Sequence, residues 1–146
     1  MPQPTFTASP IDPETIRAYL ETEYHVLGEA PFILRVGEAS AALRAAHARQ
    51  GVTCSTFITA GNPHSRILSA SANAARQQTL AAELRRLQLA YVPGIGRHPA
   101  NQWPGEESFL VFGLALEKAK SLATRFAQNG IIWSGADGVP QLVLLC

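Results

Sequence analysis

The sequence has few cysteines and lacks any pair of them at the spacing of metal ligands. Cys54 and Cys146 are the only two, and they lie far apart in a chain of 146 residues. Disulfide-stabilised scaffolds and cysteine-rich zinc sites both need several cysteines at closer spacing. The sequence therefore excludes these two classes, and we expect Cys54 to be a reduced thiol that packs as a small apolar side chain in a strand.

Long apolar runs are also lacking. No stretch approaches the roughly 20 apolar residues that a membrane-spanning helix needs, and residues 1–10 have neither the basic start nor the apolar core of a signal peptide. We therefore expect a cytoplasmic protein without a membrane partner. In this interpretation residues 1–10 are a loosely held leader, and residues 11–146 form a single domain.

The chain has little net charge, since 12 basic residues face 11 acidic ones and give a formal charge of +1. This balance argues against a protein built to bind nucleic acid or acidic membranes. The segment between Arg35 and Arg97 is nevertheless basic, with eight arginines against Glu38 and Glu83. Most of these arginines fall on predicted helices, where a solvated face explains them. The alternative is a surface for a protein partner.

Motifs that identify a reaction are missing as well. Ser65 and Ser108 stand outside the GxSxG pattern of hydrolase nucleophiles. The sequence GIG at 94–96 lacks the third glycine and the following helix of a phosphate-binding loop, so we interpret it as a flexible turn. His64 and His98 could bind iron together with Glu106 or Glu107, but nothing fixes their separation. The sequence assigns no metal and leaves the cofactor unknown.

Caps, turns and the spacing of apolar residues predict four helices and about six or seven strands. In chain order, these are a helix from Asp12 to about Glu23, strands at 24–27 and 31–36, a helix between Ser40 and Gly51, a strand at 54–60, a long helix capped by Ser69 or Ser71, strands at 89–92 and 108–114, a helix at 116–126, and strands at 131–133 and 141–145. The order αββαβαββαββ predicts a compact α+β domain with a mixed sheet.

The directions of these elements predict where a site lies. Helical crossovers normally join parallel strands, and short loops join antiparallel ones. If the end where the 54–60 strand finishes is the top of the sheet, four polar segments meet there: 19–24, 59–65, 94–108 and 126–129. A ligand site at this edge follows from that convergence.

The loop at 59–65 is the centre of this predicted site, because it leaves the sheet with polar side chains and free backbone amides. The candidate ligand-binding residues are Tyr19, Tyr24, Thr59, Asn62, Ser65, Ser108, Gln128 and Asn129. Glu106, at the mouth of a buried strand, is the candidate catalytic acid or base. For Asn129 the alternative is a helix C-cap formed with Gly130.

The long helix and the two tryptophans carry further expectations. The helix should bury Leu80, Leu84 and Leu87, with Asn73 on the same face and hydrogen-bonded to the 61–66 loop. Trp133 is expected in the core, whereas Trp103 lies on a long proline-flanked loop and is a candidate lid over the site.

Several phrases of the sequence resemble an uncharacterised family of bacterial proteins, the domain of unknown function DUF3293. They are AYLETEY, FITAGNPHS, LSASAN, WPGEESFLVFG and FAQNGIIW, and the similarity covers nearly the whole chain from Ile11 onward. The recurring polar positions of the family match Thr59, Asn62, Pro63, Ser65, Asn73, Glu106, Ser108, Gln128 and Asn129. Gly61 departs from the family, where a bulky aromatic residue is common. The resemblance implies no catalytic residue.

The leading functional hypothesis is a site for a small polar or nucleotide-like metabolite, because the converging groups are mostly neutral hydrogen-bonding side chains with aromatic neighbours. One alternative is a protein-interaction or regulatory module that uses the basic middle segment. A second alternative is a hydrolase or transferase in which Glu106 is the acid or base.

Overall fold

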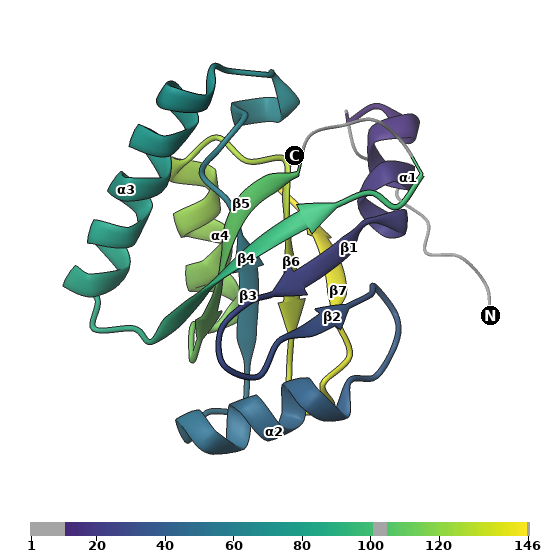
Figure 1. The fold of residues 1–146 in the computed structure, drawn as a ribbon, viewed down its shortest axis with the longest axis vertical. Coiled ribbons are helices and arrows are strands. Elements are labelled where there is room, and N and C mark those ends of the chain that lie inside the picture. Colours follow the sequence, from purple (N-terminus) through teal and green to yellow (C-terminus); the bar gives the residue numbers. More distant parts are fainter. Residues whose placement is uncertain (1–10, 101–104, 146) are drawn as a thin grey trace.

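The helices and strands follow one another in the predicted order (Figure 1). The computed structural model describes residues 11–100 and 105–145, and it contains four α-helices and seven strands in these residues. They are α1 (Pro13–Glu21), β1 (Glu23–Val26), β2 (Phe32–Leu34), α2 (Ala41–Gln50), β3 (Ser55–Ile58), α3 (Ala70–Arg86), β4 (Tyr91–Arg97), β5 (Glu106–Phe112), α4 (Leu116–Arg125), β6 (Gly130–Ser134) and β7 (Gln141–Leu144). A 3-10 turn at Pro63–Ser65 lies between β3 and α3. The predicted lid residue Trp103 and the leader lie outside the described residues.

Local sequence signals begin the first three helices and end the second. Asp12 accepts a hydrogen bond from the Glu14 amide at the start of α1, and Ser40 accepts one from the amide of Leu43 in α2. Ser69 caps α3, since its hydroxyl accepts a hydrogen bond from the backbone amide of Ala72. Gly51 ends α2 with φ of 68°, a left-handed conformation that glycine adopts without strain.

The seven strands form one sheet in the order β2-β1-β4-β5-β3-β6-β7, and every pairing is antiparallel. The expected mixed sheet is therefore wrong in this respect. Strands joined by a helix do run in the same direction, but an antiparallel strand lies between them. β5 separates β3 from β4, and β3 separates β5 from β6. The strand directions, and hence the predicted top edge, are unaffected.

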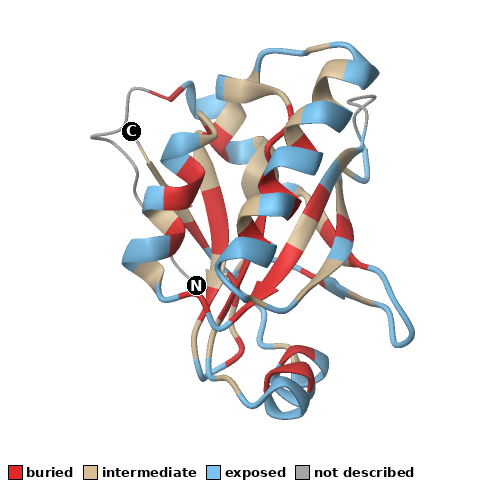
Figure 2. Ribbon diagram, turned by 90° about the vertical axis from the view of Figure 1, so that its left-hand side faces the viewer, coloured by how far each residue is buried: buried red, intermediate tan, exposed pale blue. Residues whose placement is uncertain are grey.

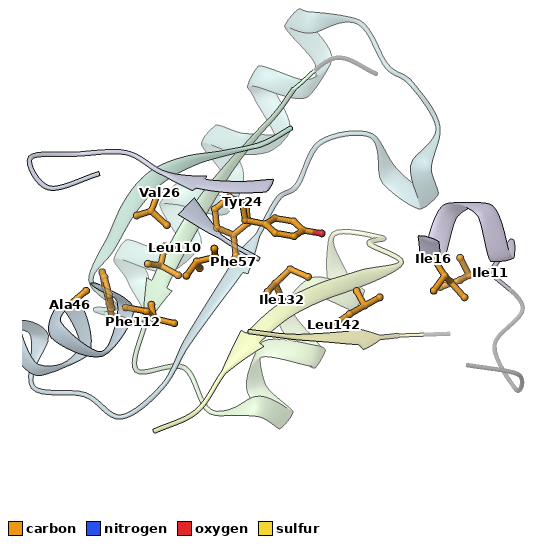
Figure 3. Close-up of a cluster of buried hydrophobic side chains, with 12 residues drawn as sticks. Ile11, Ile16, Tyr24, Val26, Ala46, Phe57, Leu110, Phe112, Ile132 and Leu142 are labelled. Carbon is orange, nitrogen blue, oxygen red and sulfur yellow. The ribbon is translucent and has the colours of Figure 1, made fainter. Parts of the chain in front are cut away.

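The two faces of the sheet are covered differently. Helices α3 and α4 pack on one face around Ile58, Leu84 and Val111 (Figures 1 and 2). The opposite face carries the aromatic and aliphatic residues of Figure 3, among them Tyr24 and Phe57. We call this second surface the open face, because among the helices of the described residues only α1 at its top end and α2 at its bottom end lie against it (Figure 1). The open face is where space remains.

Several boundaries differ from the prediction. β4 continues through Gly94 and Gly96 to Arg97, so the expected flexible turn is strand. Glycine is required at the first of these positions, because a Cβ atom on Gly94 would lie 2.6 Å from Cε2 of Phe57. β5 begins earlier than predicted, at Glu106. Cys54 lies just before β3 and is half-buried, and burial raises the pKa of its thiol.

The buried stripe of α3 also differs from the prediction at one end. Leu80 and Leu84 are fully buried, as expected, and Gln77 is buried with them. Leu87, predicted to complete the stripe, is 39% exposed because the helix ends at Arg86. Within the described residues, no helix is long and apolar enough to cross a bilayer.

Candidate functional site

A pocket of about 480 Å³ lies between α1 and the top of the open face. Figure 3 shows the Tyr24 side chain reaching from the sheet toward α1 across this region. All four segments that the sequence predicts to converge contribute to its wall. Of the predicted site residues, those that line it are Tyr19, Tyr24, Thr59, Asn62, Ser65, Glu106, Ser108 and Gln128. The geometric convergence is thus observed, and the binding or catalytic roles of these residues stay predictions.

Asn129 is the one predicted ligand-binding residue that does not line the pocket. Its Nδ2 atom donates to the hydroxyls of Ser65 at 3.0 Å and Tyr19 at 3.4 Å. The alternative role as a helix C-cap is wrong, because Ala127 takes the left-handed conformation after α4, with φ of 58°. Asn129 instead holds two pocket hydroxyls in place.

The Tyr19 and Ser65 hydroxyls form a hydrogen bond of 2.8 Å, which joins α1 to the turn after β3. Tyr24 reinforces this end of the site, since its hydroxyl donates to the Tyr19 carbonyl at 2.7 Å. Burial raises the pKa of Tyr24 well above its usual value, and the carboxylate of Glu106 raises it further. Tyr24 therefore remains a protonated donor at neutral pH.

The backbone amides of residues 60–62, 64 and 65 in the predicted loop already donate hydrogen bonds within the protein, contrary to the prediction that they are free. The amides of Ala60, Gly61 and Asn62 donate to the side chains of Gln77, Thr59 and Asn73. The amides of His64 and Ser65 donate to backbone carbonyls. A loop with its amides used in this way cannot cradle a phosphate, so only its side chains face the pocket with unused capacity.

Asn73 hydrogen-bonds the loop as predicted. Its Oδ1 atom accepts from the Asn62 amide at 2.8 Å, and its Nδ2 atom donates to the side-chain oxygen of Asn62 at 2.9 Å. The same Asn62 oxygen accepts from the Leu68 amide at 3.0 Å. Both ends of the Asn73 amide thus fix the position of Asn62, whose own Nδ2 atom faces away from these contacts.

Arg76 and Gln77 are supporting residues that the sequence analysis missed. Arg76 donates to the carbonyls of Ala60 and Phe126, and so joins the 59–65 loop to the end of α4. Gln77 is buried, and its Oε1 atom accepts from the Ala60 amide at 3.0 Å. The only sequence signal for these two residues is that they lie on a helix that follows a polar turn. Solvent-exposed residues of a helix share this position, so the signal does not identify supporting residues.

The loop carries backbone strain. Asn62, His64 and Ser65 have φ values of 45°, 50° and 62°, and none of them is glycine. Such left-handed residues cost roughly 1–3 kcal/mol each and occur preferentially at functional sites. The hydrogen bonds from α3 and Asn129 hold the loop in this conformation, which places Ser65 against Tyr19.

Pocket-lining groups from three adjacent strands lie side by side at the top of the open face. Tyr24 of β1 pairs with Gly96 of β4, and Gly96 pairs with Glu106 of β5. A Cβ atom on Gly96 would have no neighbour nearer than 3.7 Å, and its φ is not in the left-handed region. The fold therefore does not demand glycine here. Its absent side chain leaves a notch between Tyr24 and Glu106.

The charged groups around the pocket are mostly acidic. Asp12, Glu14 and Glu106 line it, whereas none of its described lining residues is lysine or arginine. His98 also lines it, and its Nε2 atom lies 3.2 Å from a Glu21 carboxylate oxygen. The Nδ1 atom of His98 accepts a hydrogen bond from the Ala100 amide at 3.1 Å.

The other functional alternatives stay predictions. Within residues 11–100 and 105–145, no three His, Cys, Asp or Glu side chains are grouped as metal ligands. Four arginines of the basic middle segment donate hydrogen bonds within the protein: Arg35, Arg76, Arg85 and Arg86. Of these, Arg35 and Arg86 remain exposed on the surface.

One comparison with known proteins decides the family. The family described as a protein of unknown function, DUF3293, matches residues 58–131, which is just over half of the chain. The chain belongs to this family. No curated protein and no solved structure matches it. The matched DUF3293 region contains the strained loop, Glu106 and Gln128, whereas Tyr19 and Tyr24 precede it.

Proposed function

We propose that the pocket under α1 binds a small polar metabolite without a phosphate group. The observation that carries this proposal is hydrogen-bonding capacity of Gln128, Tyr19, Ser65 and Asn62 that no other described residue takes up. A volume of about 480 Å³ lies in the range of small-molecule sites. The absence of lysine and arginine from its described lining disfavours a phosphate-bearing ligand, and so refines the nucleotide-like hypothesis.

Gln128 supplies an acceptor. The side chain is 7% exposed, and its Nε2 atom donates to the carbonyls of Gly61 at 3.0 Å and Phe126 at 3.2 Å. Only an amide nitrogen can donate to two carbonyl oxygens, so these bonds fix which end of the amide is the oxygen. No described residue donates to Oε1, and the side chain lines the pocket. A ligand donor would satisfy this oxygen.

Tyr19 and Ser65 supply a donor. The two hydroxyls hold two protons and share one hydrogen bond, while Asn129 donates to both oxygens. Whichever hydroxyl donates to the other, one proton is left without a described acceptor. Asn62 adds a second donor, because its oxygen is occupied by Leu68 and Asn73 and its Nδ2 atom is not.

We propose that this binding takes place in the cytoplasm, as expected from the sequence, and in a bacterial cell, as the resemblance to DUF3293 implies. Chemistry on the bound molecule by Glu106 would be a second step in the same pocket, and a turnover assay with any ligand found would reveal it. Binding alone is the function that the unused donors and acceptors support.

The test is thermal melting of the purified protein with a panel of polar amines, alcohols, amides and sugars. Gly96→Val should fill the notch and remove any stabilisation by ligand, because the new side chain projects into the pocket without overlapping the backbone. Pro93→Val is the matched control, since Pro93 is an exposed residue of the same strand. The proposal fails if no compound raises the melting temperature of the parent, or if Gly96→Val and Pro93→Val respond alike.

A further inference from the structure

We propose that the ligand is a small amine, whose ammonium group binds between the Glu106 carboxylate and Oε1 of Gln128. Its other polar end is a neutral acceptor, such as a hydroxyl, placed against Tyr19 and Ser65. This inference rests on the proposed function, and it names the class of molecule that the pocket selects.

The two acceptors lie at the same end of the sheet. The pairing of β3 with β5 ends at Ile58 and Phe109, and both Gly61 and Glu106 lie three residues beyond that last pair. The Gln128 amide donates to the carbonyl of Gly61. Glu106 and Gln128 both line the pocket. An ammonium group has three donors and no acceptor, which suits a carboxylate and an amide oxygen.

The charge of the lining favours a cation. Three of the described lining side chains are carboxylates, and none is lysine or arginine. Residues 1–10, 101–104 and 146, which the structure does not describe, add no charged side chain of either sign. A pocket lined by one sign of charge attracts the opposite sign and repels like charge. Free amino acids fit less well than amino alcohols, because their carboxylate would meet this negative field.

The floor of the pocket suits a hydrocarbon body. Phe57, Ile132 and Leu142 line it and belong to the hydrophobic cluster of the open face (Figure 3). Their contact with the ligand would remove apolar surface from water. The donors of Tyr19, Ser65 and Asn62 line the same pocket, so the ligand needs an acceptor of its own in addition to its apolar part.

Two series of compounds separate charge from shape. The first is phenylalaninol with 3-phenylpropan-1-ol, which lacks the amine, and phenylalanine, which carries a carboxylate. The second is leucinol with 4-methylpentan-1-ol and leucine. Titration calorimetry at pH 7.5 keeps the amines of both amino alcohols protonated. We expect each amino alcohol to bind at least about tenfold more tightly than its two comparators, the usual size of a charge-assisted hydrogen bond.

Glu106→Gln should weaken the binding of the amino alcohols by about tenfold or more and leave the plain alcohols unchanged. Glu107→Gln is the matched control, because Glu107 is the exposed neighbour in β5 that does not line the pocket. Salt dependence adds a measurement on the parent alone. Raising the ionic strength should weaken the binding of the amino alcohols and leave the binding of the plain alcohols unchanged.

The amine proposal is overturned if a plain alcohol binds as tightly as its amino alcohol, if no amine binds, or if the two glutamine variants behave alike. Its failure is distinct from failure of the pocket. Binding of a neutral compound that Gly96→Val abolishes would keep the proposed function while removing the amine.

Discussion

The side chain of Asn73 uses both ends of its amide to hold Asn62, accepting from its backbone nitrogen at 2.8 Å and donating to its side-chain oxygen at 2.9 Å. This pair fixes the loop that lines the pocket, because Asn62 has a left-handed backbone that an isolated chain would avoid. The conformation of the loop therefore depends on a helix that follows it in the sequence.

Replacing Asn73 with leucine should lower the free energy of unfolding by roughly 1–3 kcal/mol, the cost of leaving partly buried polar groups unpaired. Urea denaturation measures the change. Ala74→Leu, at the exposed neighbouring position of α3, is the control and should have little effect. An unchanged midpoint with an unchanged slope in Asn73→Leu would show that the loop is held without this side chain.

The two glycines that face the pocket side of β4 should respond in opposite ways to valine. Gly94→Val places a Cβ atom 2.6 Å from the ring of Phe57 and should destabilise the fold by about 1–3 kcal/mol. Gly96→Val meets no such overlap, and it should be neutral or stabilise by up to about 1 kcal/mol, since glycine weakens a strand. Urea melts of both variants compare them, and equal destabilisation would contradict the distinction.

Tyr19→Phe should destabilise the protein by about 0.5–1.5 kcal/mol, because it removes the hydrogen bond to Ser65 and the one from Asn129. The control is Tyr91→Phe, which removes a hydroxyl bonded to an exposed arginine. The loss of stability in Tyr91→Phe should be near zero. Equal melting temperatures of the two variants would mean that the Tyr19 hydroxyl does not fasten α1 to the loop.

His47 should make stability depend on pH. It is 4% exposed, its ring lies 2.8 Å from the Ser55 hydroxyl, and burial lowers its pKa below the ordinary value of 6.5. Below about pH 6.5, His47 binds a proton in the unfolded chain more readily than in the folded protein, because its pKa is lower in the folded protein. Stability contributed by neutral His47 is thus present above that pH and is lost as the pH falls toward the folded pKa.

Chemical denaturation at pH 7.5 and pH 5.5 tests this expectation. The parent should lose more stability between the two values than His47→Gln does. His64→Gln, at an exposed histidine, is the control and should keep the slope of the parent. An identical loss in the parent and in His47→Gln would assign the pH dependence to other groups.

Element order and strand direction could be predicted from the sequence, because they depend on local signals such as the Ser40 cap and on the lengths of connections. Which strands are neighbours in the sheet could not be predicted. The helical connection through α3 can return the chain to either side of an intervening strand, so β3 and β4 are parallel in direction yet not adjacent. The position of the pocket could be predicted from the strand directions alone, because these directions decide which segments meet at the top of the sheet.

The supporting residues of the site were harder to predict. Arg76 resembles any solvated arginine of a helix until its two carbonyl acceptors are known. Gly94 and Gly96 cannot be told apart by residue type. Only the position of Phe57 in the structure shows that the fold requires glycine at 94, whereas the glycine at 96 leaves a notch. The prediction of free amides in the 59–65 loop was wrong, because three of their acceptors come from α3 and from the segment after α4, and two come from within the loop.

The placement of β3 between β5 and β6 has a consequence for folding kinetics. Ser55 pairs with Phe112 on one side and with Ser134 on the other, so this interior part of the sheet joins segments that are distant in the chain. Such non-local pairing slows folding. The pocket is lined by residues from Asp12 to Leu142 and is completed only when the first helix meets the last strand. In refolding experiments, ligand affinity should therefore appear in the slowest phase, after most of the helical signal has returned.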